Sequence, residues 1–194
     1  MANIPVSDIQ TLRERTGVGM MDAKRALEES GGDIEAAITA LRKGGKKVAD
    51  KKASRATHEG VVGVYEHSNK KLVTLVSVAC ETDFVARTED FQTLAHDLAM
   101  HVAAANPTYL AAEDIPAEVR AQEEEIARTQ AAGKPANIVE SIVQGKVKKF
   151  AEDNCLLEQK FFKDDSKTVA SVVHEAVQRM GENIQVKEFV RVTV

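Results

Sequence analysis

Histidine and cysteine side chains are the first candidates for chemistry in this chain, because they serve as bases, nucleophiles and metal ligands. The sequence holds five histidines and two cysteines. His58-Glu59 and His174-Glu175 each begin like the HExxH zinc motif, but neither has a second histidine four positions after the first. His96 and His101 are five apart, which places them on different faces of a helix. We predict no metal site and no catalytic residue from these spacings.

Phosphate-binding and nucleophile motifs are also incomplete. Gly17-Val18-Gly19 lacks the rest of a dinucleotide fingerprint, and Gly133-Lys134 lacks the upstream glycine and the Ser or Thr of a phosphate loop. Cys80 ends an apolar run, where a buried cysteine usually acts as a small hydrophobic residue. We therefore expect no active site of its own, no cofactor and no direct binding of nucleotide.

One segment has residues suited to contact with another protein instead of catalysis. Glu81-Thr82-Asp83-Phe84-Val85-Ala86 sets an acid beside a large aromatic in a chain with only 4% aromatic residues. It joins a predicted strand to a helix capped by Thr88, so rigid elements hold it at both ends. Two interpretations remain open. Either Phe84 folds back on the core while Asp83 makes local turn hydrogen bonds, or the pair is presented to a partner protein.

The first 45 residues predict a module of three short helices. In the first helix Ile9 and Leu12 are expected to face inward. Gly17 and Gly19 separate this helix from the second. Asp33 caps the third helix, whose apolar residues keep the spacing of one buried face: Ile34, Ala37, Ile38 and Leu41. Gly44-Gly45 is expected to end that helix and close the module.

Residues 46–59 are expected to form a basic linker. Seven Lys or Arg residues lie between positions 42 and 55, against the single acid Asp50. The linker is either a solvated connector or a phosphate-binding segment of an RNA-associated protein, in which case RNA binding would depend on Lys46, Lys47, Lys51 and Lys52. The net charge of −4 argues against a nucleic-acid partner. The protein as a whole has a further possible function, that of an adaptor that binds its target through the first 43 residues alone.

Residues 60–194 predict an α+β core. Two β-branched runs around the turn His67–Lys70 indicate a hairpin, and the second run is apolar enough to be a central strand. Thr88 and Ser166 are expected to cap helices, and residues after Ile184 alternate like a final strand. Three strands that do not alternate strictly with helices predict a small three-stranded antiparallel sheet packed by helices.

Composition limits the compartment. No apolar run approaches the roughly 18 residues of a membrane span, and the N-terminus lacks the basic and apolar regions of a signal peptide. Two cysteines are too few for a disulfide framework. We expect a cytoplasmic protein without membrane association.

Four runs of the sequence resemble the signatures of one protein family. Leu12–Leu27 (LRERTGVGMMDAKRAL) resembles the opening signature, and Gly32–Ala37 (GDIEAA) continues it. Thr82–Ala86 (TDFVA) is similar to the second signature and Met100–Ala104 (MHVAA) to a third, in the family's order. The family that the chain resembles is that of elongation factor Ts. This resemblance implies an N-terminal three-helix module similar to ubiquitin-associated domains, then an α+β core.

The resemblance also implies a function and the residues that perform it. Elongation factor Ts is a guanine-nucleotide exchange factor: it binds elongation factor Tu carrying GDP and promotes GDP release by disturbing the magnesium site, so that GTP can rebind. By this resemblance, the segment that disturbs the magnesium site comprises Thr82, Asp83, Phe84 and Val85. The N-terminal module would meet the GTPase through Leu12, Arg13, Met20 and Met21. His101 would lie on a core surface near the same partner.

The chain departs from the long form of the family. Phe84 and His101 are only 17 residues apart and joined by one helix, whereas the long form carries the corresponding signatures in two core halves. Short members resemble homodimers that rebuild the two halves from two chains. We therefore expect residues 60–194 to serve also as a dimerisation domain.

Overall fold

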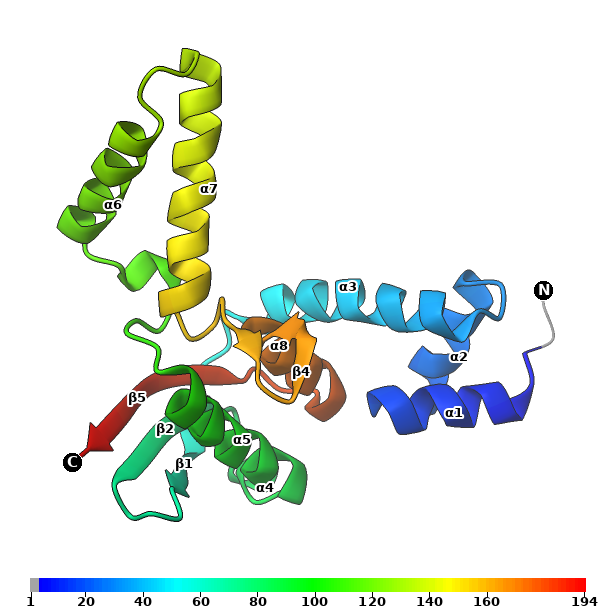
Figure 1. Ribbon diagram of the computed structural model, residues 1–194. Coiled ribbons are helices and arrows are strands. Elements are labelled where there is room, and N and C mark those ends of the chain that lie inside the picture. The colour runs from blue at the N-terminus through cyan, green and yellow to red at the C-terminus, as the bar shows by residue number, and fades with distance from the viewer. Residues whose placement is uncertain (1–3) are drawn as a thin grey trace. The chain divides into compact units, whose positions relative to one another are not determined.

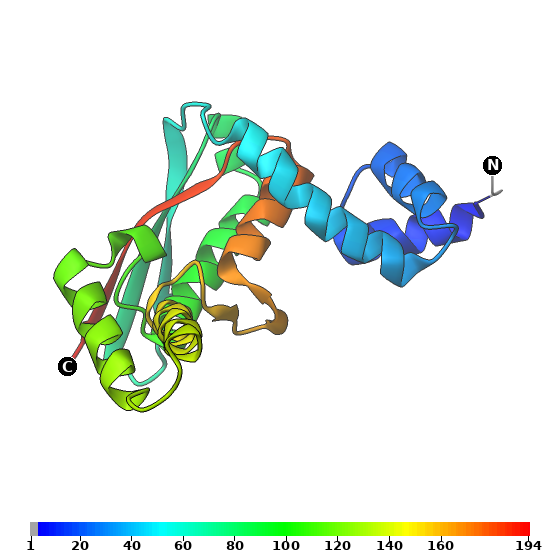
Figure 2. The same cartoon turned by 90° about the horizontal axis from the view of Figure 1, so that it is seen from above.

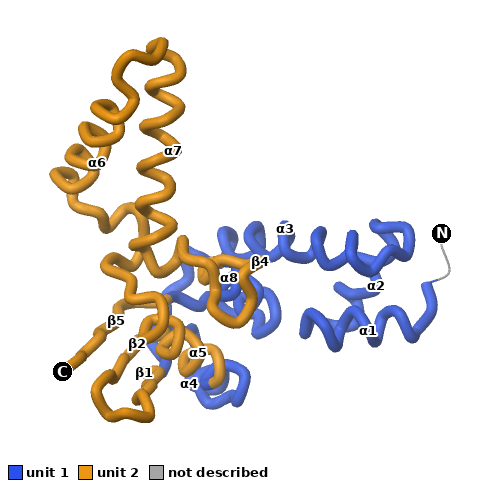
Figure 3. Tube along the Cα trace, viewed as in Figure 1, with its two compact units in different colours: residues 1–61, 79–92, 171–185 blue, residues 62–78, 93–170, 186–194 orange. Residues whose placement is uncertain are grey.

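The computed structural model describes residues 4–194, which form two compact units (Figure 3). Unit 1 comprises the chain up to Val61 together with Ala79–Gln92 and Ser171–Gln185. Unit 2 comprises Val62–Val78, Thr93–Ala170 and Val186–Val194. Each unit therefore combines segments that are far apart in sequence.

Three helices begin the chain and pack pairwise against one another (Figure 2): α1 (Val6–Thr16), α2 (Met20–Glu29) and α3 (Ile34–Lys52). Their common core consists of buried apolar side chains: Ile9, Leu12, Val18, Ala23, Ala26, Leu27, Ala37, Ile38 and Leu41. Asp33 caps α3, because its Oδ1 accepts hydrogen bonds from the amides of Glu35 at 2.9 Å and Ala36 at 3.0 Å. The predicted three-helix arrangement is confirmed.

The expected end of α3 at Gly44-Gly45 is wrong. The helix continues to Lys52, so half of the expected linker is helical. Gly45 is buried against α8 (Val169–Met180), where an added Cβ would lie 3.0 Å from Gln178 Oε1. Lys52 also donates a hydrogen bond to the carbonyl of Gly181. This packing outweighs the cost of about 1 kcal/mol that a glycine adds to a helix interior.

The main sheet has three strands in the order β1-β2-β5: β1 (Glu59–Glu66), β2 (Leu72–Cys80) and β5 (Gln185–Thr193). It is antiparallel, and β2 is the central strand as predicted. The amide of His67 donates to the carbonyl of Leu72 at 2.8 Å and closes the hairpin at the expected turn. The α+β class and the three-stranded sheet packed by helices are confirmed.

Helix α5 (Glu89–Ala105) covers one face of this sheet. The hydroxyl of Thr74 donates to the carbonyl of Ala99 at 2.6 Å. A Cβ added to Gly63 would lie only 2.1 Å from the carbonyl oxygen of Ala95, so the strand and helix backbones touch there. Thr88 caps α5 as predicted, since its Oγ1 accepts the amide of Phe91 at 3.3 Å.

A helical hairpin follows the short 3-10 turn Ala112–Asp114. Its helices, α6 (Ala117–Gln130) and α7 (Ala136–Asn154), lie side by side (Figure 1). At its base a small apolar cluster forms around Ile115, Ala151 and Cys155. No helix within residues 4–194 is both long enough and apolar enough to cross a membrane.

For the two remaining strands the sequence predicted no definite element. β3 (Lys160–Phe161) and β4 (Asp164–Thr168) form a separate two-stranded sheet. Ser166 therefore does not cap the last helix, which begins at Val169. Its amide and hydroxyl instead donate to Asp164 Oδ1 at 3.1 and 2.6 Å, a local bond that competes with capping.

Candidate functional site

The segment Thr82–Val85, called the tip below, lies on a single helical turn, α4 (Asp83–Ala86), between β2 and α5. Thr82 is its N-cap, and the amide of Val85 donates to Thr82 Oγ1 at 3.4 Å. The side chain of Phe84 is 80% exposed. The interpretation in which Phe84 folds back on the core is therefore wrong, and the aromatic ring is presented to solvent.

Asp83 carries the negative charge of the tip. Its Oδ2 lies 3.0 Å from the guanidinium of Arg87, one helical turn later, and most of the Arg87 side chain is in solvent. Exposed pairs of this kind contribute at most about 1 kcal/mol. A partner could therefore replace Arg87 at small cost. Ala86 is buried behind the turn and leaves Asp83 and Phe84 facing outward.

Cys80 supports the tip from behind and is not a nucleophile. Its side chain is fully buried, and Sγ donates to the carbonyl of Thr82 at 3.2 Å. Burial raises the pKa of the thiol, and the negative charge of Glu182 raises it further. The thiol therefore stays protonated near neutral pH, which agrees with the predicted role as a small hydrophobic residue.

The N-terminal module presents three of its four predicted contact residues. Met20 and Met21, at the start of α2, are 56% and 76% exposed. Arg13 is exposed as well, and its Nε donates to the carbonyl of Val18 at 3.4 Å. Leu12 is completely buried in the core of the module, so the expectation that it meets a partner is corrected. It lies on the inward stripe of α1 with Ile9 and holds the helices together.

His101 is likewise buried instead of lying on a surface. Its Nδ1 accepts the amide of Phe162 at 3.3 Å, so in the neutral ring Nε2 carries the hydrogen and donates to Gln159 Oε1 at 3.0 Å. Burial lowers the pKa of His101, which keeps the ring neutral. The expected contact between His101 and a partner is therefore corrected to a role in packing α5.

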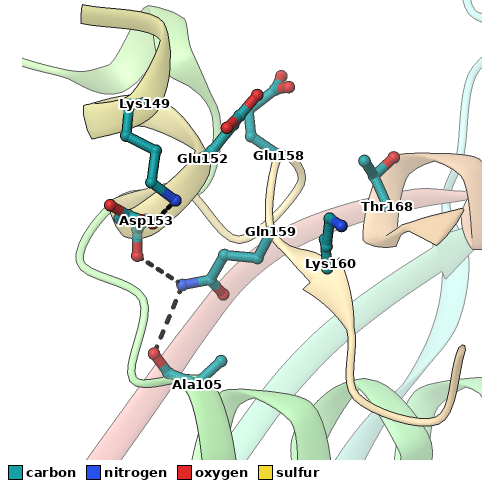
Figure 4. A pocket seen from close by; sticks show the side chains of 8 residues that line it. All are labelled: Ala105, Lys149, Glu152, Asp153, Glu158, Gln159, Lys160 and Thr168. Atoms are coloured by element: carbon teal, nitrogen blue, oxygen red, sulfur yellow. Dashed lines mark hydrogen bonds and ion pairs between the residues drawn. The ribbon is translucent and has the colours of Figure 1, made fainter. Parts of the chain in front are cut away.

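A cavity of about 350 Å³ lies beside this network (Figure 4). The amide nitrogen of Gln159 donates to the carbonyl oxygens of Asp153 at 2.9 Å and Ala105 at 3.4 Å. The charged residues of the lining are Lys149, Glu152, Asp153, Glu158 and Lys160. Carboxylates outnumber ammonium groups there, so the lining does not favour a nucleotide phosphate. The absence of direct nucleotide binding stays a prediction.

Helix α8 joins the predicted contact elements within unit 1, a role that no sequence motif indicated. Its Arg179 lies 3.3 Å from Asp90 at the start of α5. A Cβ added to Gly17, which has a φ of 69°, would lie 2.5 Å from Arg179 Cδ. The N-terminal helices and the tip therefore belong to one compact unit. Periodicity predicted the helix but not its contact with the N-terminal helices.

Comparison with known proteins identifies the family. The family model described as Elongation factor TS matches residues 10–194. A protein named Elongation factor Ts from Thermosipho melanesiensis is 53% identical over 188 residues, which cover 96% of each chain. The proteins of that name from Moorella thermoacetica and Syntrophomonas wolfei are 51% and 52% identical, over 98% and 96% of this chain and 95% and 88% of their own. The chain therefore belongs to the elongation factor Ts family of translation elongation factors.

Proposed function

We propose that this chain is a guanine-nucleotide exchange factor that binds elongation factor Tu carrying GDP and promotes release of the GDP. The exposed acid–aromatic tip is the observation that carries the proposal. Family membership supports the choice of partner. In this role the chain needs no chemical active site of its own, because it changes only the lifetime of a complex.

The exchange follows from differential binding. If the chain binds nucleotide-free elongation factor Tu more tightly than the GDP-bound form, then it must weaken GDP binding by the same factor. It does not need to touch the nucleotide. It needs only surfaces that fit the nucleotide-free conformation of the GTPase better.

The tip would supply that difference. GDP on a translational GTPase is held together with a Mg²⁺ ion that offsets phosphate charge. In the proposed mechanism, Phe84 enters an apolar slot of the GTPase and Asp83 exchanges Arg87 for polar groups of the partner. The displaced element takes with it the groups that position Mg²⁺, and GDP leaves once that charge is no longer offset. Thr82 and Val85 hold the turn that presents the pair.

The N-terminal module would act as an anchor. Residues 1–45 are proposed to dock on the GTPase domain through Arg13, Met20 and Met21, which are exposed. Methionine side chains adapt to uneven apolar surfaces and are common at such contacts. Binding energy from this surface would support the distortion at the magnesium site.

We also propose that the chain acts as a homodimer through residues 60–194. Side chains alternate between the two faces of a strand, so Val62, Val64 and Leu75 lie on the sheet face opposite to Gly63 and Thr74, which α5 covers. All three are exposed. A second copy of the chain would cover this apolar face.

Replacing Phe84 with alanine tests the exchange function. Burying a phenylalanine stabilises a complex by about 1.5–3 kcal/mol, so Phe84→Ala should reduce the acceleration of GDP release by about 10- to 100-fold. The measurement is the fluorescence decay of a labelled GDP on elongation factor Tu after mixing with excess unlabelled GDP.

Ile138→Ala is the matched control, because Ile138 is a large exposed apolar residue on α7, outside the tip. That variant should accelerate release like the wild type. If the wild-type chain left the release rate unchanged, the proposed function would be wrong. If the wild type accelerated release and Phe84→Ala accelerated it equally, Phe84 would have no part in the mechanism.

A further inference from the structure

Glu182, which follows α8 and Gly181, forms hydrogen bonds with the residues at the start of the tip. Glu182 is half-buried, and both of its carboxylate oxygens are engaged. Oε2 accepts the amides of Glu81 at 3.1 Å and Thr82 at 3.0 Å. Oε1 accepts the hydroxyl of Thr82 at 2.6 Å. Hydrogen bonds to a charged acceptor are about twice as strong as neutral ones, so this carboxylate fixes Thr82, the first residue of the tip, and Glu81 before it.

The contact is reciprocal. The amide of Asn183 donates to Glu81 Oε1 at 2.6 Å, so the segments 81–82 and 182–183 each supply a carboxylate to the backbone of the other. The side-chain amide of Asn183, which is almost completely buried, donates to the carbonyls of Ala53 at 3.3 Å and Arg55 at 2.8 Å. The end of β2, the end of α8 and the chain after α3 thus share one hydrogen-bond network.

Apart from Glu182, the tip is held by Cys80, whose Sγ donates to the carbonyl of Thr82, and by hydrogen bonds to residues of its own turn and to Thr88. Helix α4 is a single turn of four residues, and a helix that short is not stable by itself. Ala86 is its only buried residue, and a methyl group gives it a small apolar anchor. The direction in which Asp83 and Phe84 point therefore depends on the residues that precede them, Glu81 and Thr82, which Glu182 holds.

We propose that Glu182 is a positioning residue for nucleotide exchange, which sets the orientation of Asp83 and Phe84 without touching the GTPase. The inference rests on the proposed exchange function. It differs from a general structural role, because an effect of Glu182 that passes through Phe84 must disappear when the ring of Phe84 is absent.

The test is a double-mutant cycle on the rate of GDP release from elongation factor Tu. Glu182→Ala should reduce the acceleration about tenfold, the effect typical of losing charged hydrogen bonds. Adding Glu182→Ala to Phe84→Ala should cause a much smaller further reduction, because only the orientation of Asp83 is then left to lose. Glu182→Gln should restore most of the acceleration, because its amide oxygen can accept the two backbone amides and its amide nitrogen can donate to the Thr82 hydroxyl.

Hydrogen exchange of the peptide 81–88 provides a readout independent of the partner. Glu182→Ala should increase the rate of amide hydrogen exchange in this peptide and leave the rate in α6 and α7 unchanged. Glu125→Ala, which removes an exposed glutamate from α6, is the matched control and should alter neither rate. Urea unfolding verifies that each variant folds. If Glu182→Ala does not, Glu182→Asp takes its place: it keeps the charge, reaches less far and should slow release several-fold.

The outcomes separate the two proposals. A wild-type chain that does not accelerate release contradicts the exchange function itself. If the wild type accelerates release and Phe84→Ala does not, but the folded Glu182 variants match the wild type, only the positioning role is overturned. Equal reductions by Glu182→Ala with and without Phe84 overturn it as well, since Glu182 would then act by another route.

Discussion

Burial separates two ring-bearing residues that the family resemblance places near the same partner. Phe84 is exposed at the end of a short turn, whereas His101 is enclosed by Phe161, Phe162 and Gln159. The ring of His101 lies 5.9 Å from that of Phe161, close to parallel with it. The first residue can contact another protein directly, and the second can affect binding only by holding α5 in place.

The neutral state of His101 leads to a prediction about pH. Burial lowers its pKa below the ordinary 6.5, so the unfolded chain binds a proton that the folded chain does not. The contribution of neutral His101 to the free energy of unfolding is therefore fully present above about pH 6.5. It falls as the pH drops from there toward the lower pKa of the folded state. Urea unfolding between about pH 5 and 8 should show this loss.

His101→Asn should be less stable at every pH but should depend less on pH below about 6.5. Some dependence should remain, because burial also lowers the pKa of His174. A pH dependence identical to that of the wild type would mean that His101 binds its proton equally well in both states.

The sequence could not predict which individual side chains of a motif are buried and which are exposed. The pattern placed Leu12 on the inward face of its helix, while the family signature suggested a partner contact. Only the packed structure decides between them, because a motif can be shared for its packing as well as for its surface. The exposure of Phe84 was open for the same reason: only the packed structure shows that Ala86, and not Phe84, is the buried residue of this turn.

At the scale of elements, the glycine pair in α3 offers a matched comparison. A Cβ at Gly44 would meet nothing within 4 Å, whereas one at Gly45 would lie 3.0 Å from Gln178 Oε1. Gly44→Ala should raise the free energy of unfolding by about 0.5–1 kcal/mol. Gly45→Ala should gain less or lose stability. Equal gains in urea unfolding would show that Gln178 moves aside without cost.

The close approach of β1 and α5 gives a stronger effect. Because a Cβ at Gly63 would lie 2.1 Å from a backbone oxygen, Gly63→Ala requires strand and helix to separate. We expect a loss of about 3 kcal/mol, the upper part of the range for overpacking. Gly145→Ala is the control, since Gly145 lies in α7 with open space around its Cα. A small loss at Gly63, measured by urea unfolding, would contradict this tight contact.

Long elements were predicted well and short ones were missed. The helices with an apolar stripe and the hairpin strands carry a period that extends over many residues. The turn Asp83–Ala86 and the strands Lys160–Phe161 and Asp164–Thr168 are too short to show a period. Helix α3 was cut short because glycine propensity is local, whereas the contact of Gly45 with α8 joins residues far apart in sequence.

At the scale of the whole molecule, the uncovered sheet face leads to a prediction about assembly. Val64→Lys should leave the single chain folded, because Val64 is half exposed, but should prevent a second copy from covering the apolar face. Sedimentation at micromolar concentration should then show a dimer for the wild type and a monomer for the variant. Ile138→Lys, on α7, is the control and should stay dimeric. A monomeric wild type would contradict the proposed homodimer.

The pairing of β5 with β2 and the hydrogen bonds of Glu182 have a consequence for dissecting this chain. All the family signatures end by residue 104, so an excised piece covering residues 1–105 would look self-sufficient. It would lack β5, one edge of the sheet, and the carboxylate that orients a turn a hundred positions upstream. A minimal fragment must therefore keep the last residues of the chain, where no recognisable motif lies.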